Sequence, residues 1–139
     1  VAEITESDAM YIWTFHNNNK FTNFFNNANP YFKITNTRLI LSNHPQIRDT
    51  SYNIFIPGDF QEYAVVSKYP ATGNTEHFVF FSQHDIGVSA TVDYFTNADS
   101  LASFERKYLG GKNYFTAVFN VKGQDRTNTD IDLELVVNF

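Results

Sequence analysis

The sequence predicts an all-β fold: a two-sheet antiparallel β-sandwich, of jelly-roll or immunoglobulin-like type, with one short helix. Three observations predict it. Apolar and polar residues alternate with a period of two in several segments, as they do in strands with one buried face. Aromatic residues make up 17% of the chain, with 15 Phe and 8 Tyr, and they favour pleated surfaces. Turn-forming residues separate the segments.

The chain has 139 residues, which is a common size for one domain. Two domains would leave each half too small for a good core. We therefore expect a single β-sandwich domain over residues 1–139.

The strongest alternation lies at residues 130–139. Its apolar residues fall on one predicted face: Ile131, Leu133, Leu135, Val137 and Phe139. Residues 114–121 alternate in the same way, and the segment between them, 122–129, is polar. These features predict an antiparallel hairpin whose loop is longer than the tightest turns.

Further strands are predicted from shorter patterns. They lie at residues 10–16, 31–34, 38–41, 52–56, 63–69, 77–82 and 88–94. The continuous apolar run Phe78-Val79-Phe80-Phe81 is typical of a strand that is covered on both faces.

One segment has helical rather than strand periodicity. Its apolar residues are Leu101, Phe104, Tyr108 and Leu109. Asn97 or Asp99 can cap the start of a helix over 99–109, and Gly110-Gly111 can end it. The Asn-rich stretches 17–19 and 23–29 are expected to form a loop.

Composition excludes several function classes. The formal net charge is −5 and the ten Lys and Arg residues are scattered, so no nucleic-acid-binding face is expected. The chain has no Cys, which rules out disulfides and thiolate metal sites. No apolar run approaches the roughly 18 residues that span a bilayer, so no membrane insertion is expected.

The residues that can act as acids, bases or metal ligands lack the usual motifs. Ser82, His84 and Asp85 are close in sequence, but there is no nucleophile-elbow motif, and a polar turn explains them better. His77 and Glu76, with His84, lack the spacing of zinc ligands. The sequence therefore predicts no catalytic residue, no metal, no cofactor and no enzyme.

The acidic residues near the C-terminus permit a second metal hypothesis. Asp125, Asn128, Asp130, Asp132 and Glu134 supply oxygen atoms of the kind that calcium binds, and the last three share one predicted strand face. On one strand face they would be about 7 Å apart, which is too far for all three to hold one ion. A solvated outer face is the favoured interpretation.

Aromatic and amide side chains near the N-terminus suggest a glycan site. Sugar-binding sites stack aromatic rings on the ligand and surround them with amides and carboxylates. Tyr11, Trp13 and Tyr31, with amides such as that of Asn18, supply these groups. In the alternative interpretation, Trp13 belongs to the core and the Asn residues form a loop.

Apolar residues at positions expected to face water suggest a protein interface. Phe24, Phe25 and Tyr114 are expected at the surface, because a small core has room for only part of the 23 Phe and Tyr residues. Val118 and Val136 also fall on a predicted outer face. Such patches are typical of contacts with another protein.

These patterns favour a non-enzymatic assembly or attachment protein. We expect a homo-oligomeric subunit of a virion, phage particle or surface appendage, located on a virion or at the cell surface, whose partner is another copy or another structural protein. A carbohydrate-binding module is the alternative, with a glycan as partner. The candidate binding residues are Tyr11, Trp13, Asn18, Phe24, Phe25, Tyr31 and Tyr114.

Overall fold

A computed structural model describes residues 9–14, 19–35, 37–54, 61–70, 73–83, 85–124 and 127–139 of the chain. Within these ranges, the side chains of residues 9–14, 19–21, 24, 85, 124 and 127–129 are not described.

Most of the described secondary structure is β, in two sheets. The larger sheet has the order β1-β6-β5-β7-β8: β1 (Ala9–Thr14), β6 (Glu76–Ser82), β5 (Gln61–Pro70), β7 (Phe115–Gln124) and β8 (Thr127–Asn138). Its neighbouring strands are antiparallel except β1 and β6, which are parallel. The smaller antiparallel sheet has the order β2-β3-β4: β2 (Phe32–Ile34), β3 (Arg38–Leu41) and β4 (Thr50–Asn53).

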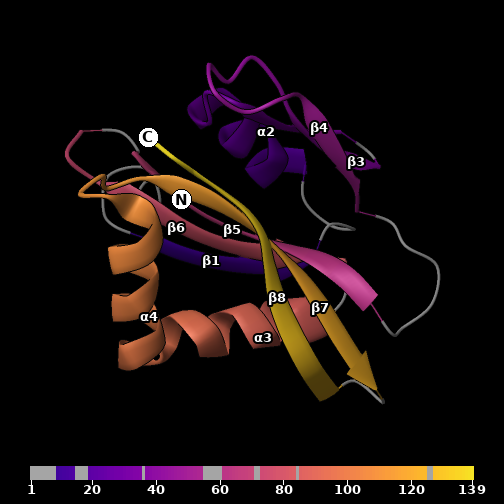
Figure 1. Ribbon diagram of the computed structural model, residues 1–139. Coiled ribbons are helices and arrows are strands. Elements are labelled where there is room, and N and C mark those ends of the chain that lie inside the picture. The colour runs from indigo at the N-terminus through magenta and orange to yellow at the C-terminus, as the bar shows by residue number, and fades with distance from the viewer. Residues whose placement is uncertain are drawn as a thin grey trace.

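Helices cover both sides of the larger sheet (Figure 1). They are α2 (Asn19–Ala28), α3 (Asp85–Thr96), α4 (Ala98–Phe104) and the π-helical turn η2 (Glu105–Leu109). Helices α3 and α4 lie on one side of the larger sheet, while α2 and the smaller sheet lie on the other. The prediction of a single short helix is therefore wrong. No helix in the described part of the chain is long and apolar enough to cross a membrane.

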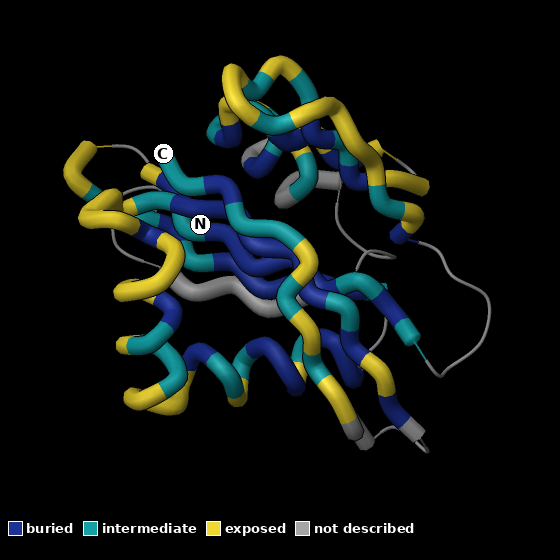
Figure 2. Tube along the Cα trace, viewed as in Figure 1, coloured by how far each residue is buried: buried dark blue, intermediate teal, exposed yellow. Residues whose placement is uncertain are grey.

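Two cores result from this layering. The inter-sheet core joins α2 and the two sheets: Phe25, Phe32, Ile34, Leu39, Leu41, Ile54, Val65, Tyr69, Val79, Phe81, Val118 and Val137. The helix-side core lies under α3, α4 and η2: Ala64, Val66, Phe80, Ala90, Phe95, Phe104, Leu109, Phe115, Ala117, Phe119 and Val121. Burial is accordingly densest along the central strands (Figure 2).

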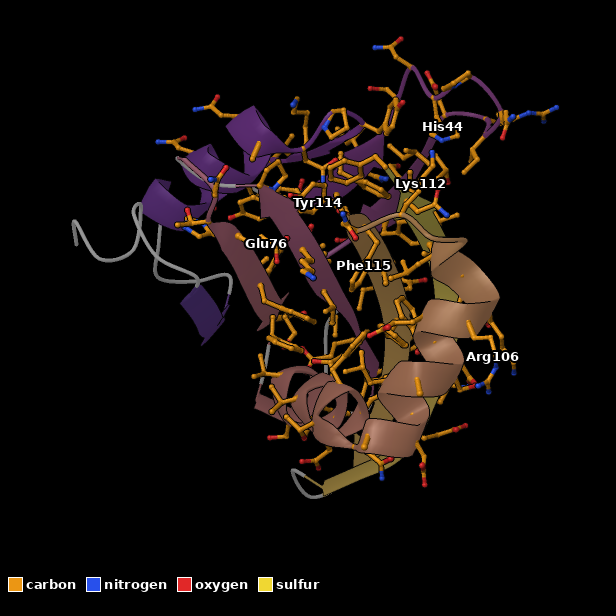
Figure 3. All side chains as sticks on the ribbon, turned by 90° about the vertical axis from the view of Figure 1, so that its left-hand side faces the viewer. His44, Glu76, Arg106, Lys112, Tyr114 and Phe115 are labelled. Atoms are coloured by element: carbon orange, nitrogen blue, oxygen red, sulfur yellow. The ribbon has the colours of Figure 1, made fainter. Side chains whose placement is uncertain are left out.

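Figure 3 shows Tyr114 and Phe115 at the start of β7. Phe115 belongs to the helix-side core, and Arg106 projects from the helical layer.

The segment predicted as a strand at 88–94 is instead the middle of α3. Its buried residues lie four residues apart, as on one face of a helix: Ile86 and Ala90, and also Gly87, Thr91 and Phe95. The Thr91 hydroxyl is buried and donates to the carbonyl oxygen of Gly87 at 2.8 Å, as helical threonines commonly do. The apolar residues Val88, Ala90, Val92 and Tyr94 occupy every second position, so they gave a strand-like pattern within a helix.

The helix predicted at 99–109 is confirmed as α4 followed by η2. The Asn97 side chain caps it by accepting from the backbone N–H groups of Asp99 and Ser100, at 3.0 and 3.1 Å. Gly110 ends it in the left-handed conformation, with φ of 56°, which glycine adopts without a steric penalty.

Strand β8 is confirmed, but its apolar residues do not share one face. Phe119 pairs with Leu133 while Val118 pairs with Leu135, so Glu134 is an extra residue in a β-bulge. Leu133 and Val136 consequently pack on the helix-side core, and Leu135 packs on the inter-sheet core. The predicted outward positions of Val118 and Val136 are therefore wrong. The predicted long loop is wrong as well, because pairing continues to Gln124 and Thr127.

Replacing Leu133 with aspartate is expected to lower the free energy of unfolding by about 2–4 kcal/mol, because it places an unpaired carboxylate against the helix-side core. Asp132→Ala, one residue away and exposed, should change it by less than about 0.5 kcal/mol. Urea denaturation monitored by circular dichroism measures both variants. Equal effects would contradict the register of β7 and β8.

Candidate functional site

The two edges of the larger sheet have opposite chemical character. Strand β1 forms one edge, and within the described residues no strand pairs with its outer side. Its sequence, AMYIWT, has no charged residue and no proline. An edge strand exposes a row of backbone donors and acceptors, and such an uncharged edge can receive a strand from another chain.

Strand β8, at the opposite edge, has features that prevent strand addition. Asp130, Asp132 and Glu134 are exposed along it. The pairing of β7 with β8 also shifts register twice, between Val118 and Phe119 and between Lys122 and Gly123. Charges and bulges on an edge strand disfavour pairing with another chain. The acidic residues therefore have a structural explanation at this edge.

The backbone of β1 is held firmly by its inner neighbour. It pairs with β6 over its whole length, from Ala9 opposite His77 to Thr14 opposite Ser82. Strand β6 in turn pairs with the buried central strand β5. The outer edge of β1 therefore belongs to a sheet whose neighbouring strands are continuously paired and largely buried.

The candidate binding residues are distributed over several parts of the structure. Tyr11 and Trp13 lie in β1, opposite Val79 and Phe81, but their side chains are outside the described set. Asn18 lies outside the described residues, as does the side chain of Phe24 in α2. The structure thus brings Tyr11 and Trp13 together on the open edge.

Two of the predicted surface aromatics are not exposed. Phe25 is 0% exposed and lies at the centre of the inter-sheet core, which contradicts its predicted surface position. Tyr114 is half-buried and its ring lies 5.9 Å from that of Phe139, with backbone hydrogen bonds in both directions between the two residues. The only large exposed apolar side chain within the described set is Tyr108, at 38%. The expected excess of surface aromatics is therefore wrong for the described part.

Tyr31 is engaged within the smaller sheet and its loops. Its ring packs edge-on against that of His44 at 4.6 Å. His44 is itself held in place, because its Nδ1 accepts from the backbone N–H groups of Gln46 and Ile47, both at 3.1 Å. This arrangement stabilises the loop between β3 and β4.

A buried polar chain connecting the layers was not predicted from the sequence. The Asn29 side chain is 1% exposed and donates to the Thr116 hydroxyl at 2.5 Å, and Thr116 lies 2.7 Å from the Ser67 hydroxyl. The Asn29 Oδ1 accepts from the backbone N–H groups of Tyr31 and Phe32. These bonds fix the smaller sheet on the larger one. The Asn-Pro pair at 29–30, a turn signal, was the available hint.

The described residues do not form an arrangement that supports the catalytic hypothesis or the zinc hypothesis. His84 lies outside the described residues, and His77 is buried with its ring 5.5 Å from that of Tyr69. In the described ranges, no three His, Asp or Glu side chains are grouped so that they could hold a metal ion. The absence of a metal and of catalysis stays a prediction.

Comparison with known proteins finds no matching family model, no matching curated protein and no matching solved structure.

Proposed function

We propose that the protein is a non-enzymatic assembly or attachment domain that joins copies of itself through the outer edge of β1. The observation that carries this proposal is the contrast between the uncharged edge of β1 and the charged, bulged edge of β8. The β8 edge is protected against strand addition, and the described part of the β1 edge has no such protection. A role in a virion, phage particle or surface appendage, outside the cell, belongs to the same proposal.

The favoured geometry is antiparallel pairing of β1 with β1 of a second copy. A two-fold axis makes the same strand both donor and acceptor, and closed two-fold dimers are the commonest oligomers. Two five-stranded sheets would then form one continuous sheet, which remains within the usual size of open sheets. The finer fold assignment, a sandwich of jelly-roll or immunoglobulin-like type, also stays a proposal. It is supported by the core that the two sheets share.

A pair of proline variants tests the edge. Successive residues of a strand point their N–H groups to opposite sides, so one of Tyr11 and Ile12 donates toward β6 and the other outward. We expect one of Tyr11→Pro and Ile12→Pro to remain folded but become monomeric, and the other to lose stability. Light scattering across a concentration range and thermal melting measure the two effects. A wild type that is monomeric at every concentration contradicts the proposal.

Cysteine crosslinking tests the antiparallel geometry, and the chain is free of native Cys. Single cysteines at positions 10–13 should form intermolecular disulfides under mild oxidation, with the highest yield nearest the two-fold axis. Asp132→Cys, exposed on the β8 edge, is the matched control and should not crosslink. Equal yields at the two edges would indicate random collision rather than a β1 interface.

A further inference from the structure

The loop that joins β3 to β4, residues 42–49, is folded around one histidine (Figure 3). His44 lies near the start of this loop, and its imidazole Nδ1 accepts hydrogen bonds from the backbone N–H groups of Gln46 and Ile47, both at 3.1 Å. One ring nitrogen therefore closes the turn that follows it. We call residues 42–49 the His44 loop.

Only a neutral imidazole can accept these two bonds. In the neutral ring one nitrogen carries a proton and the other accepts, whereas both nitrogens of an imidazolium are donors. Because Nδ1 is the acceptor here, the closed loop selects the neutral ring with its proton on Nε2. Protonation of Nδ1 would direct a new N–H toward the two backbone N–H groups and would remove both bonds.

The backbone before His44 makes the closed loop depend on its side-chain bonds. Asn43 has a φ of 61°, in the left-handed region that residues other than glycine adopt infrequently. Its N–H donates to the Asp49 Oδ1 at 3.2 Å, which joins the two ends of the loop. Because the left-handed conformation costs free energy, the bonds to His44 and Asp49 are needed to hold it.

The His44 loop covers part of the inter-sheet core. Ile47 and Tyr31 are half-buried and pack against that core. The Tyr31 ring also contacts the His44 ring edge-on, at 4.6 Å between centroids. Opening of the loop would therefore expose apolar surface on both side chains.

The surroundings of His44 contain no described ion-pair partner for a protonated ring. The charged residues of the loop are Arg48 and Asp49, and the titratable group packed on the imidazole ring is the Tyr31 phenol. In the described part of the chain, no Asp or Glu forms an ion pair with His44. An aromatic ring attracts a cation, but one such contact at a partly exposed position does not replace two lost hydrogen bonds.

We propose that the His44 loop is a pH-dependent conformational switch, closed while the imidazole is neutral and opened when the ring takes up a proton. The closed loop accepts only the neutral ring, so its stability is present at higher pH and is lost as the pH falls. Imidazoles generally take up a proton between about pH 8 and about pH 5, where aspartate carboxylates are generally still ionised. This inference is independent of the proposed β1 interface.

NMR on the intact chain, between about pH 8 and about pH 5.5, tests the switch. At the higher pH we expect the Nε2–H tautomer of His44 and contacts between the Tyr31 and His44 rings. As the imidazole titrates, the exchange protection of the Gln46 and Ile47 amides, corrected for the intrinsic effect of pH, should fall at least about tenfold. The amides of β5 are the internal reference and should stay protected. A Nδ1–H tautomer, an imidazole that stays neutral, or protection that does not change with its titration would overturn the proposal.

Two variants at position 44 separate proton uptake from general loop stability. Asn carries an acceptor oxygen at the position of Nδ1 and does not titrate, so His44→Asn should keep the loop closed over the whole pH range. His44→Ala has no acceptor and should leave the loop open throughout. A pH-dependent opening that persists in His44→Asn would contradict the role of the imidazole.

Asp49→Asn is the matched control for the other titratable side chain of the loop. Its amide oxygen can still accept from the Asn43 N–H, so the variant should open at the same pH as the wild type. Loss of the transition in Asp49→Asn would assign the pH dependence to Asp49 instead. A parallel loss of protection in β5 would indicate global unfolding and would also contradict a local switch.

Discussion

Replacing Phe25 with serine is expected to lower the free energy of unfolding by about 3–5 kcal/mol. The ring is 0% exposed, and it meets the rings of Phe81 at 5.4 Å and Tyr69 at 6.4 Å, both edge-on. Serine would leave a cavity between α2 and the larger sheet and would add a hydroxyl with no designed partner. A domain with a typical stability of roughly 5–15 kcal/mol would lose a large part of it.

Chemical denaturation measures this effect, and Tyr108→Ser is the matched control. Tyr108 is 38% exposed, so its loss should change stability by less than about 1 kcal/mol. The sequence predicted that Phe25 lies at an interface. In that case the same substitution would dissociate an oligomer and leave the stability of the domain unchanged. A Phe25→Ser variant of unchanged stability but reduced size in solution would restore that interpretation.

Strands could be predicted where a period of two coincides with burial of one or both faces. Those at 31–34, 38–41, 63–69 and 77–82 are confirmed within two residues as β2, β3, β5 and β6. Alternation is a local property of the chain, so a single sequence shows it directly. The β8 face switch was not predictable in the same way, because a bulge arises from pairing with β7.

Helices α2 and α3 were not predicted, because other sequence signals in the same segments competed with the helical period. In α2, apolar residues recur at Phe21, Phe24, Phe25 and Ala28, which is a helical spacing. The surrounding Asn residues usually mark turns, so the segment was predicted to be a loop. In α3, Val88, Val92 and Tyr94 fit a strand, whereas the buried residues of the same segment follow the helical period.

The error about surface aromatics has a definite physical cause. A two-layer fold has one core, but this larger sheet is covered on both faces and therefore has two. Rings such as Phe95 and Phe115 pack in the helix-side core, stacked at 5.8 Å. The run at 78–81 already indicated a strand covered on both sides, so the sequence contained the signal for a second covering layer.

The candidate site depends on strand order, which a single sequence does not contain. Nothing in AMYIWT distinguishes an edge strand from a central one, and only its position beside β6 makes it an edge. The row of Tyr63, Asn120 and Asp132 likewise requires the registers of β5, β7 and β8. Both arrangements are consequences of long-range pairing.

Replacing Gly87 with alanine is expected to lower the free energy of unfolding by about 2–4 kcal/mol, although alanine normally stabilises a helix by roughly 1 kcal/mol relative to glycine. Gly87 lies in the first turn of α3, over the fully buried Glu62, whose Oε2 accepts from the Gly87 N–H at 2.6 Å. An added Cβ would lie 2.8 Å from both that oxygen and the Ser82 Cβ. Such overpacking costs roughly 1–3 kcal/mol, and displacing the buried hydrogen bond between Gly87 and Glu62 costs roughly 1–3 kcal/mol more.

A double-mutant cycle tests whether the Glu62 side chain causes the expected loss of stability in Gly87→Ala. Glu62→Ala removes the oxygen that the new Cβ would meet, so in that background Gly87→Ala should cost at least about 1 kcal/mol less than in the wild type. Ser89→Ala, exposed in the same helix, is the control and should be neutral or slightly stabilising. Urea denaturation of all four chains in the cycle gives the coupling energy. A Gly87→Ala variant that is more stable than the wild type would show that Glu62 and Ser82 do not lie against this turn, because these two contacts oppose the ordinary preference of a helix for alanine.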